Sequence, residues 1–408
     1  MPEKYTLSSH DELFKFFYIP IMDAAMNTAT PTKSQMKRIK NWTGKTIKGV
    51  GVLSMGGGVG NDVIPLPSVR QTGEVAYDPI AIWGTSVLDW EAIIASGDDK
   101  GAFVEATRFE VESMMLSFVN NESRQYFGSS TGILGAIDGN APVLNGDGTW
   151  TFIVSDATWM LPHWEVGNII NFHTNNNPFE ITAVDKVLKA ITVSRRTGSF
   201  DPTTLTTENV YMQNSKDKEM IGLGQIGDAV DNGSATIFGL RVQPRWMPYR
   251  MNGNSKPLIP EMLIELAEVM YDETGQVPSH LIMNAYQMAS LETQLEGKKE
   301  YAQMASKDAR YADIGYDALK LNTRYGAIKM FTDRFCPKTK VFAVNDKYWE
   351  FRERPKWGWL TFDGKQYLRA FTEGERPKYK ANYGGLGQHF HHPGFLGVIH
   401  TLEIPAIG

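Results

Sequence analysis

The clearest pattern of apolar and polar positions covers residues 97–127, GDDKGAFVEATRFEVESMMLSFVNNESRQYF. Apolar residues recur there at spacings of seven, four and three, which places them along one side of an α-helix. They are Val104, Val111, Met115 and Phe118. Asp98 and Asp99 stand where acidic side chains stabilise the start of a helix. The pattern therefore predicts one helix over 97–127, about 45 Å long at 1.5 Å per residue.

Residues 140–215 alternate short β-prone runs with turn residues and show no helical period. The runs are WTFIV (150–154), VGNIINFHT (166–174), FEITAV (179–184), AITVS (190–194) and VYMQN (210–214). Five strands in 76 residues predict a small antiparallel barrel that forms a unit of its own.

A mixed pattern follows. Pro260 suits a first helical turn, and Gly275 with Pro278 predicts the end of that helix. The strand SHLIMN (279–284) comes next, before a second helix that is predicted to stop at Gly297. The polar segment 298–316 is expected to be a surface loop. Further strands are predicted at 325–331, 340–346, 348–352 and 395–404.

The N-terminal region has no periodicity long enough for a core of its own. Residues 1–45 join an apolar run, FFYIPIMDAAM, to a polar and basic one, which predicts an arm that becomes ordered on a neighbour. From Thr46 to Trp83 the sequence is β-prone and rich in Gly and Pro. We expect an extended two-stranded hairpin with a glycine-rich bend, GGGVG, at its tip.

Composition narrows the class of protein. Of the 408 residues 42% are hydrophobic, which is enough to form a core. The net charge is −5, so the protein has no overall positive charge that would attract nucleic acid or anionic lipid. Cys336 is the one cysteine, which excludes internal disulfides and fits a reducing cytoplasm. Charges interrupt the N-terminus where a signal peptide is apolar, and no run approaches the roughly 18 apolar residues of a membrane span.

Two glycine-containing motifs resemble phosphate sites only in part. Gly56, Gly58 and Gly60 form G-x-G-x-G, and the prolines that follow prevent the helix that a dinucleotide site requires. Gly44-Lys45-Thr46 lacks the first glycine of a phosphate-binding loop, because Ile39 stands five residues earlier. We therefore predict no cofactor.

The other chemical candidates are histidines and one thiol. Strand alternation would place His389 and His391 on one face, where a third ligand could complete a metal site. No carboxylate lies in that stretch and Pro393 interrupts it, which favours polar surface residues and no metal. Cys336 has no partner histidine and no indication of a lowered pKa. We predict no catalytic residue and no enzyme activity.

The order of elements resembles the major capsid proteins of tailed bacteriophages, which have the Hong Kong 97 capsid fold, an α+β class. The stretches that support this resemblance are DPIAIWG (78–84), YFGSSTGILGAID (126–138), IGLGQIGDAVDNGSATIFGLRVQPRW (221–246) and the G-x-x-P-x-x-x-I-M-N run of Gly275–Asn284. The resemblance implies an N-terminal arm at 1–45, an E-loop at 46–96, a P domain with the spine helix at 97–139, an inserted β-barrel-like domain at 140–215, an A domain at 216–335, and closing strands of the P and A domains at 336–408.

Two segments are then expected to contact neighbouring subunits. Glycine tolerates the changes of backbone angle needed at non-equivalent positions of a shell, which suits the E-loop tip. The tip residues are Met55, Gly56, Gly57, Gly58, Val59, Gly60 and Asn61. The predicted contact residues of the N-terminal arm are those at positions 15–18, namely Lys15, Phe16, Phe17 and Tyr18.

The resemblance implies pentamers and hexamers of this chain in an icosahedral virion capsid, assembled in the host cytoplasm around double-stranded DNA that is not read by sequence. It also implies a separate scaffolding protein, a portal and a decoration protein. We expect no membrane partner, no N-terminal cleavage and no crosslinking. The alternatives are an encapsulin-type nanocompartment shell and, from another class, an α/β hydrolase or nucleotide-using enzyme built on residues 257–297.

Overall fold

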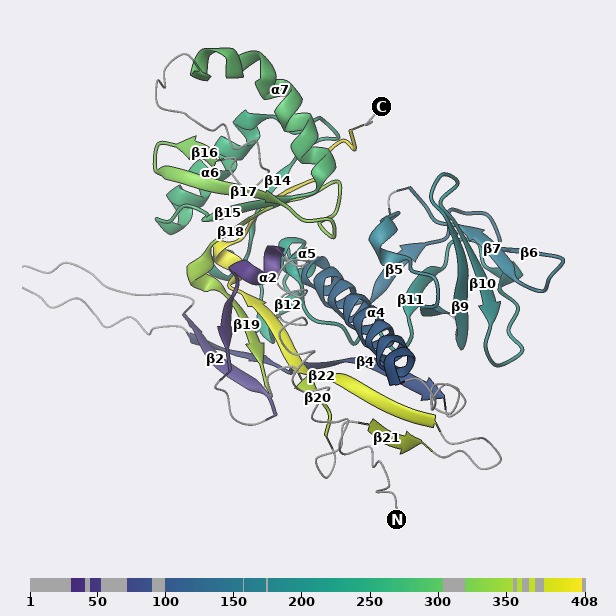
Figure 1. Ribbon diagram of the computed structural model, residues 1–408. Coiled ribbons are helices and arrows are strands. Elements are labelled where there is room, and N and C mark those ends of the chain that lie inside the picture. The colour runs from purple at the N-terminus through teal and green to yellow at the C-terminus, as the bar shows by residue number, and fades with distance from the viewer. Residues whose placement is uncertain are drawn as a thin grey trace, which may run out of the picture. The chain divides into compact units, whose positions relative to one another are not determined.

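The computed structural model describes residues 31–40, 45–52, 72–89, 100–156, 158–173, 175–303, 320–354, 358–361, 367–370 and 378–405. Helices and sheets are mixed along the chain (Figure 1). The chain forms two compact units. Unit 1 comprises Met1–Trp42, Pro79–Ser123 and Phe351–Gln388, and unit 2 comprises Thr43–Asp78, Arg124–Glu350 and His389–Gly408.

The sheet of unit 1 is organised around the long strand β22 (Lys378–His391). The strand order is β1 (Lys37–Ile39), β19 (Trp349–Glu353), β22, β20 (Gly358–Trp359). Two further strands, β4 (Ile80–Asp89) and β21 (Tyr367–Ala370), also pair with β22. β4 is antiparallel to β22 from the Asp89–Lys378 pair to the Ile80–Gly387 pair. This continuous pairing makes β4, which lies within the predicted E-loop at 46–96, a strand of this sheet.

Helix α4 (Lys100–Phe127) confirms the predicted long helix over the described residues. In unit 1 it packs on one face of the sheet. A Cβ on Gly84 would lie 3.2 Å from Met114, and the ring of Phe118 meets that of Tyr383 edge-on at 5.3 Å. Met115 and Phe118 are buried, as the apolar stripe predicts.

The predicted small barrel is a seven-stranded antiparallel sheet in unit 2. Its order is β5 (Ile133–Ala136), β11 (Asn209–Met212), β8 (Ile169–Phe172), β9 (Asn175–Asp185), β10 (Ala190–Arg195), β7 (Trp150–Ile153), β6 (Val143–Leu144). A bridge between Ile137 and Val154, with the amide of Ser155 donating to Ala136 at 2.9 Å, joins the β5 and β7 ends. This contact closes the sheet around a core that includes Phe152, Phe172 and Phe179.

The barrel begins before residue 140, the predicted start of the insertion. β5 pairs with β11 from the Ala136–Asn209 pair to the Ile133–Tyr211 pair. The prediction missed β5 because ILGA is short and follows the helix within a Gly/Ser-rich stretch. The five predicted strands are all present, and β5 and β6 complete the sheet.

A second six-stranded sheet in unit 2 is mixed. Its order is β14 (Tyr249–Asn252), β23 (Gly397–His400), β18 (Val341–Val344), β15 (His280–Met283), β17 (Gly326–Thr332), β16 (Lys320–Thr323). Helices α6 (Pro260–Thr274) and α7 (Ala285–Gln303) pack on the face that bears Leu281 and Met283 (Figure 1). The opposite face bears Phe342 and Val398 and packs against α5 (Leu223–Gly227).

The ends of α6 and α7 test the helix-stop predictions. Gly275 takes a left-handed conformation with φ 70° after α6, and its amide donates to Tyr271 at 2.7 Å, as expected of a helix C-cap. Gly297 does not end α7, which continues to Gln303. The predicted loop 298–316 was wrong at its start, because KKEYAQ consists mostly of good helix formers and no proline follows Gly297.

The remaining elements include a two-stranded ribbon. β2 (Ile47–Val52) is antiparallel to β3 (Thr72–Tyr77), in the register Ile47–Tyr77 to Val52–Thr72. A further short hairpin pairs β12 (Thr236–Ile237) with β13 (Leu240–Arg241), and α2 (Pro31–Gln35) precedes β1.

Over the ranges that the structure describes, every helix is too short or too polar to cross a membrane.

Candidate functional site

A buried ion pair joins α2 to α4 in unit 1. The ammonium of Lys33 lies 2.5 Å from Oε1 and 2.6 Å from Oε2 of Glu122, and the two side chains are 1% and 0% exposed. The same ammonium lies 5.5 Å from the ring centroid of Phe351. Burial lowers the pKa of Lys33, and the attraction of Glu122 opposes that shift.

A second carboxylate contributes to this cluster. Glu353 is 2% exposed, attracts the Lys33 ammonium, and its Oε1 atom makes no hydrogen bond with the described residues. Thr32 and Met36, on either side of Lys33, are also buried. Residues 31–36 are therefore held on unit 1 by a buried cation that faces two carboxylates.

Arg124, two residues beyond Glu122, forms the corresponding pair in unit 2. Its Nη1 atom lies 2.9 Å from Oε2 of Glu219, its Nη2 atom bonds Oε1, and both side chains are at most 5% exposed. The amide of Met220 donates to Gln125 at 3.2 Å. The final turns of α4 are thus buried around polar side chains, and Glu122, Arg124 and Gln125 each have a partner distant in sequence.

The histidines of β22 are core residues. His389 and His391 are 0% exposed and share one side of the strand, as the alternation predicts. The interpretation as polar surface was wrong, because both rings are enclosed and hydrogen-bonded. No group of three or more His, Cys, Asp or Glu that could hold a metal occurs in the described ranges.

The hydrogen bonds fix the protonation of these rings. The indole nitrogen of Trp349 can only donate, so at 2.7 Å Nε2 of His389 must accept, and Nδ1 donates to Ile221 at 3.0 Å. His391 accepts from the amide of Asn345 at 3.3 Å through Nε2. Burial lowers the pKa of His389 to about 4 and that of His391 to about 3, so both are neutral at pH 7.

Cys336 is also fully buried. Its thiol is 0% exposed and lies near the carbonyl oxygens of Ile282 and Lys340, at 3.8 and 3.7 Å. Burial, together with the charge of Asp333, raises the pKa of the thiol well above its ordinary value. This environment does not favour the thiolate that a nucleophile requires.

The predicted contact residues Lys15–Tyr18 and Met55–Asn61 lie outside the described residues. The nearest described segments are α2 for the arm and the β2–β3 ribbon for the E-loop. Val50 on that ribbon is 75% exposed, whereas Val75 is 5% exposed. Sequence reasoning missed the Lys33–Glu122 pair, because nothing in the sequence links two charges 89 residues apart.

Comparison with known proteins identifies the family. Residues 145–358, more than half of the chain, match the model of the SU10 major capsid protein family. The chain belongs to this family. A search of curated proteins finds no match.

A solved capsid structure shares the fold. The capsid asymmetric unit of cyanophage A-1(L) has a TM-score of 0.54 at 10% identity and covers 91% of this chain and 93% of its own. The capsid of Myoviridae phage XM1 gives 0.43 at 7% identity, over 90% of each chain, and mycobacterium phage Patience gives 0.39 at 10% identity, over 100% and 91%. The α+β capsid fold of the Hong Kong 97 type is confirmed.

The function follows from the family. This capsid protein is a structural protein of a tailed phage, and its copies assemble into the icosahedral shell of the virion. The buried clusters of α2, α4 and β22 are then structural elements of a shell subunit. They hold residues 31–36, helix α4 and strand β22 in fixed conformations.

The Lys33 cluster predicts an unequal effect of removing either charge. Lys33→Met leaves the buried Glu122 carboxylate without the Lys33 ammonium and should lower the free energy of unfolding by about 3–5 kcal/mol, the range for a broken buried pair. Glu122→Gln leaves Lys33 facing Glu353 and should cost less. Denaturant titration of the purified subunit measures both. Equal losses, or a loss for Lys33→Met below about 1 kcal/mol, the scale of a surface pair, would show that the cluster is not a buried ionic network.

The neutral histidines predict a pH dependence of stability. Their folded pKa values lie below the ordinary value of 6.5, so the unfolded chain binds more protons and stability falls as pH drops from 6.5 towards 4. His389→Gln keeps an acceptor for Trp349 but cannot titrate. It should reduce the slope of unfolding free energy against pH by about 1 kcal/mol per pH unit between pH 4.5 and 6. An unchanged slope would mean that His389 does not gain a proton on unfolding.

Proposed function

We propose that this capsid protein closes its shell through the E-loop tip, Met55–Asn61. The supporting observation is the β2–β3 ribbon, two strands that pair with each other and with no third strand among the described residues. A two-stranded ribbon is marginal in water unless something packs on it. A neighbouring subunit in the shell would supply that contact.

One face of the ribbon is already covered within unit 2. Tyr77 stacks on Phe390 at 5.6 Å and approaches Phe238 at 5.0 Å, and the amide of Ala76 donates to Phe238 at 2.8 Å. On the other face Val50 is 75% exposed, beside the exposed Lys48–Glu74 ion pair. The ribbon is therefore anchored at the Tyr77 end and leaves an apolar side chain for a partner.

We infer the same role for the N-terminal arm at Lys15–Tyr18. Lys33 and its two buried neighbours hold residues 31–36 on unit 1. A fixed segment at that point gives the preceding aromatic residues, Phe16, Phe17 and Tyr18, a defined place from which to reach a neighbouring subunit. Many such weak contacts, repeated around a closed shell, add up to a stable assembly.

We further propose domain roles for the remaining segments and a set of partners. The barrel would be an inserted domain and the sheet flanked by α6 and α7 the core of the A domain. A scaffolding protein, a portal and a decoration protein would join the assembly in the host cytoplasm. A net charge of −5 suits a container that does not hold its double-stranded DNA by a basic wall. The buried thiol and histidines favour a structural role without catalysis.

An encapsulin-type shell would differ in its contents. Particles purified from the natural host would then contain protein cargo, whereas phage particles contain nucleic acid. Nuclease-protected DNA inside the particles supports the phage assignment, and protein cargo without DNA contradicts it.

Deleting Met55–Asn61 should leave a folded subunit but lower the yield of closed particles by at least about tenfold, because each copy loses a repeated contact. Co-expression with a matched scaffolding protein, followed by sedimentation and electron microscopy, measures this yield. Replacing the seven residues by a Gly-Ser sequence of equal length is the control that separates loop length from side-chain contact. Particle yield equal to that of the unaltered chain would refute the role of the tip.

A further inference from the structure

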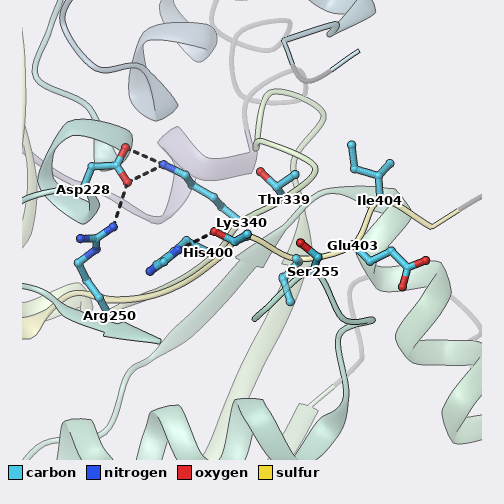
Figure 2. A pocket seen from close by; sticks show the side chains of 10 residues that line it. Asp228, Arg250, Ser255, Thr339, Lys340, His400, Glu403 and Ile404 are labelled. Carbon is cyan, nitrogen blue, oxygen red and sulfur yellow. Dashed lines mark hydrogen bonds and ion pairs between the residues drawn. The ribbon is translucent and has the colours of Figure 1, made fainter. Parts of the chain in front are cut away.

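An open pocket of about 630 Å³ lies at one end of the sheet flanked by α6 and α7, and its lining includes two cations, a histidine and hydroxyl groups (Figure 2). Arg250 comes from β14, His400 from the end of β23, and Lys340 directly precedes β18. These three strands are neighbours in the sheet. None of these groups belongs to the buried clusters described above.

The strand register explains why the three basic groups meet. Arg250 pairs with Val398, and Asn252 pairs with His400 in the parallel β14–β23 ladder, so Arg250 and His400 project from the same face. Lys340 is two residues from Phe342, which lies on that face too. Helix α5 covers the apolar part of the face, and beyond its C-terminal cap, Asp228, the face becomes basic.

Arg250 has one buried donor without an acceptor among the described residues. Its side chain is 28% exposed, its nearest acidic contact is Oδ1 of Asp228 at 4.0 Å, and its Nε atom is buried without a hydrogen bond in the described chain. A guanidinium presents five N–H donors, and leaving a buried one without a hydrogen bond costs free energy. An acceptor group bound in the pocket would satisfy the Nε donor.

The group formed by Asp228, Arg250 and Lys340 carries one net positive charge. The Lys340 ammonium donates to both carboxylate oxygens of Asp228 at 2.7 Å. These two charges balance each other, and the positive charge of Arg250 is left over. Figure 2 shows the Glu403 carboxylate directed away from the group formed by Asp228, Arg250, Lys340 and His400. Burial first, and then the charges of Arg250 and Lys340, lower the pKa of His400, while Asp228 opposes them. With Glu403 included the lining is formally neutral, so the excess positive charge is confined to the Arg250 end of the pocket.

The rim of the pocket is held in a sparsely populated backbone conformation. Thr401 has φ 57°, which is unusual for a β-branched residue, and Asn254 and Ser255 have φ 52° and 53°. The amide of Ser255 donates to Thr401 at 2.7 Å, and Nδ1 of His400 lies 2.9 Å from Oγ1 of Thr401. Such strain is retained where the surrounding structure fixes it, and here it places the Thr401 hydroxyl beside His400, with Ser255 also lining the pocket.

We propose that this pocket binds a phosphate group, with Arg250 as its main ligand and Lys340, Ser255 and Thr401 as further donors. A phosphate offers oxygens in several directions, and the donors come from three strand ends and a loop. A planar carboxylate would use only the Arg250 fork. A monoanionic phosphate also balances the single excess charge. The group can belong to free phosphate or to the backbone of the nucleic acid that a phage shell encloses.

Equilibrium dialysis of labelled inorganic phosphate against the full-length protein tests the site. One phosphate per chain is expected, and Arg250→Met should weaken binding at least tenfold, whereas exposed Arg245→Met is the matched control and should leave it unchanged. Saturable binding that survives Arg250→Met, or no saturable binding, overturns the proposal. Acetate that competes as well as phosphate also overturns it in favour of a carboxylate site.

A second measurement does not depend on the folding of a variant. In histidine-labelled protein, phosphate should raise the pKa of His400, measured by NMR, because a bound anion offsets Arg250 and Lys340. An unchanged His400 titration at saturating phosphate contradicts the site. Competition by a short oligonucleotide for the same phosphate assigns the nucleic-acid backbone as the source, and its absence assigns free phosphate. Either result is independent of whether the shell closes through the E-loop.

Discussion

Charge buried around the C-terminal turns of α4 is the interaction on which the other contacts depend. Glu122 and Arg124 are both at most 5% exposed, and each has its counter-ion from a segment at least 89 residues away. Removing a charge from water is costly, so each pair forms only when its partner segment is in place. The helix therefore specifies where residues 31–36 lie in unit 1 and where the segment around Glu219 lies in unit 2.

The other elements differ in how completely their faces are covered within the subunit. The sheet of β14, β23, β18, β15, β17 and β16 is packed on both faces, and the barrel closes on its own aromatic core. The β2–β3 ribbon is packed on one face only. A shell protein needs both kinds of element, since rigid cores keep the subunit in shape and incomplete surfaces make it join its copies.

The sequence predicts the elements well where the periodicity is long and strong. The stripe through Met115 and Phe118 predicts α4, and alternation with turn residues predicts five of the barrel strands. It fails at Gly297, where local helix propensity continues α7, and at β5, whose four residues are too few for a pattern. Burial of His389 and His391 could not be inferred, because it depends on Trp349, 40 residues away.

Contacts between charged residues that are far apart in the sequence are the second feature that sequence patterns do not predict. The sequence shows Lys33 within a basic stretch and Glu122 within a helix, and only the fold pairs them. Likewise Arg250 and His400 lie on separate strands and Lys340 directly precedes a third, and no local pattern gives the order of these strands in the sheet. The resemblance to tailed-phage capsid proteins was the stronger guide to function, because it rests on the order of elements along the chain.

Amide hydrogen exchange of free subunits and assembled shells tests the central claim, that the β2–β3 ribbon is completed by another copy. The amides of Ile47–Val52 and Thr72–Tyr77 should exchange roughly tenfold or more slowly in shells than in subunits, while those of Val119–Tyr126 should be equally protected in both. A ribbon that exchanges at the same rate in the two states would contradict the account.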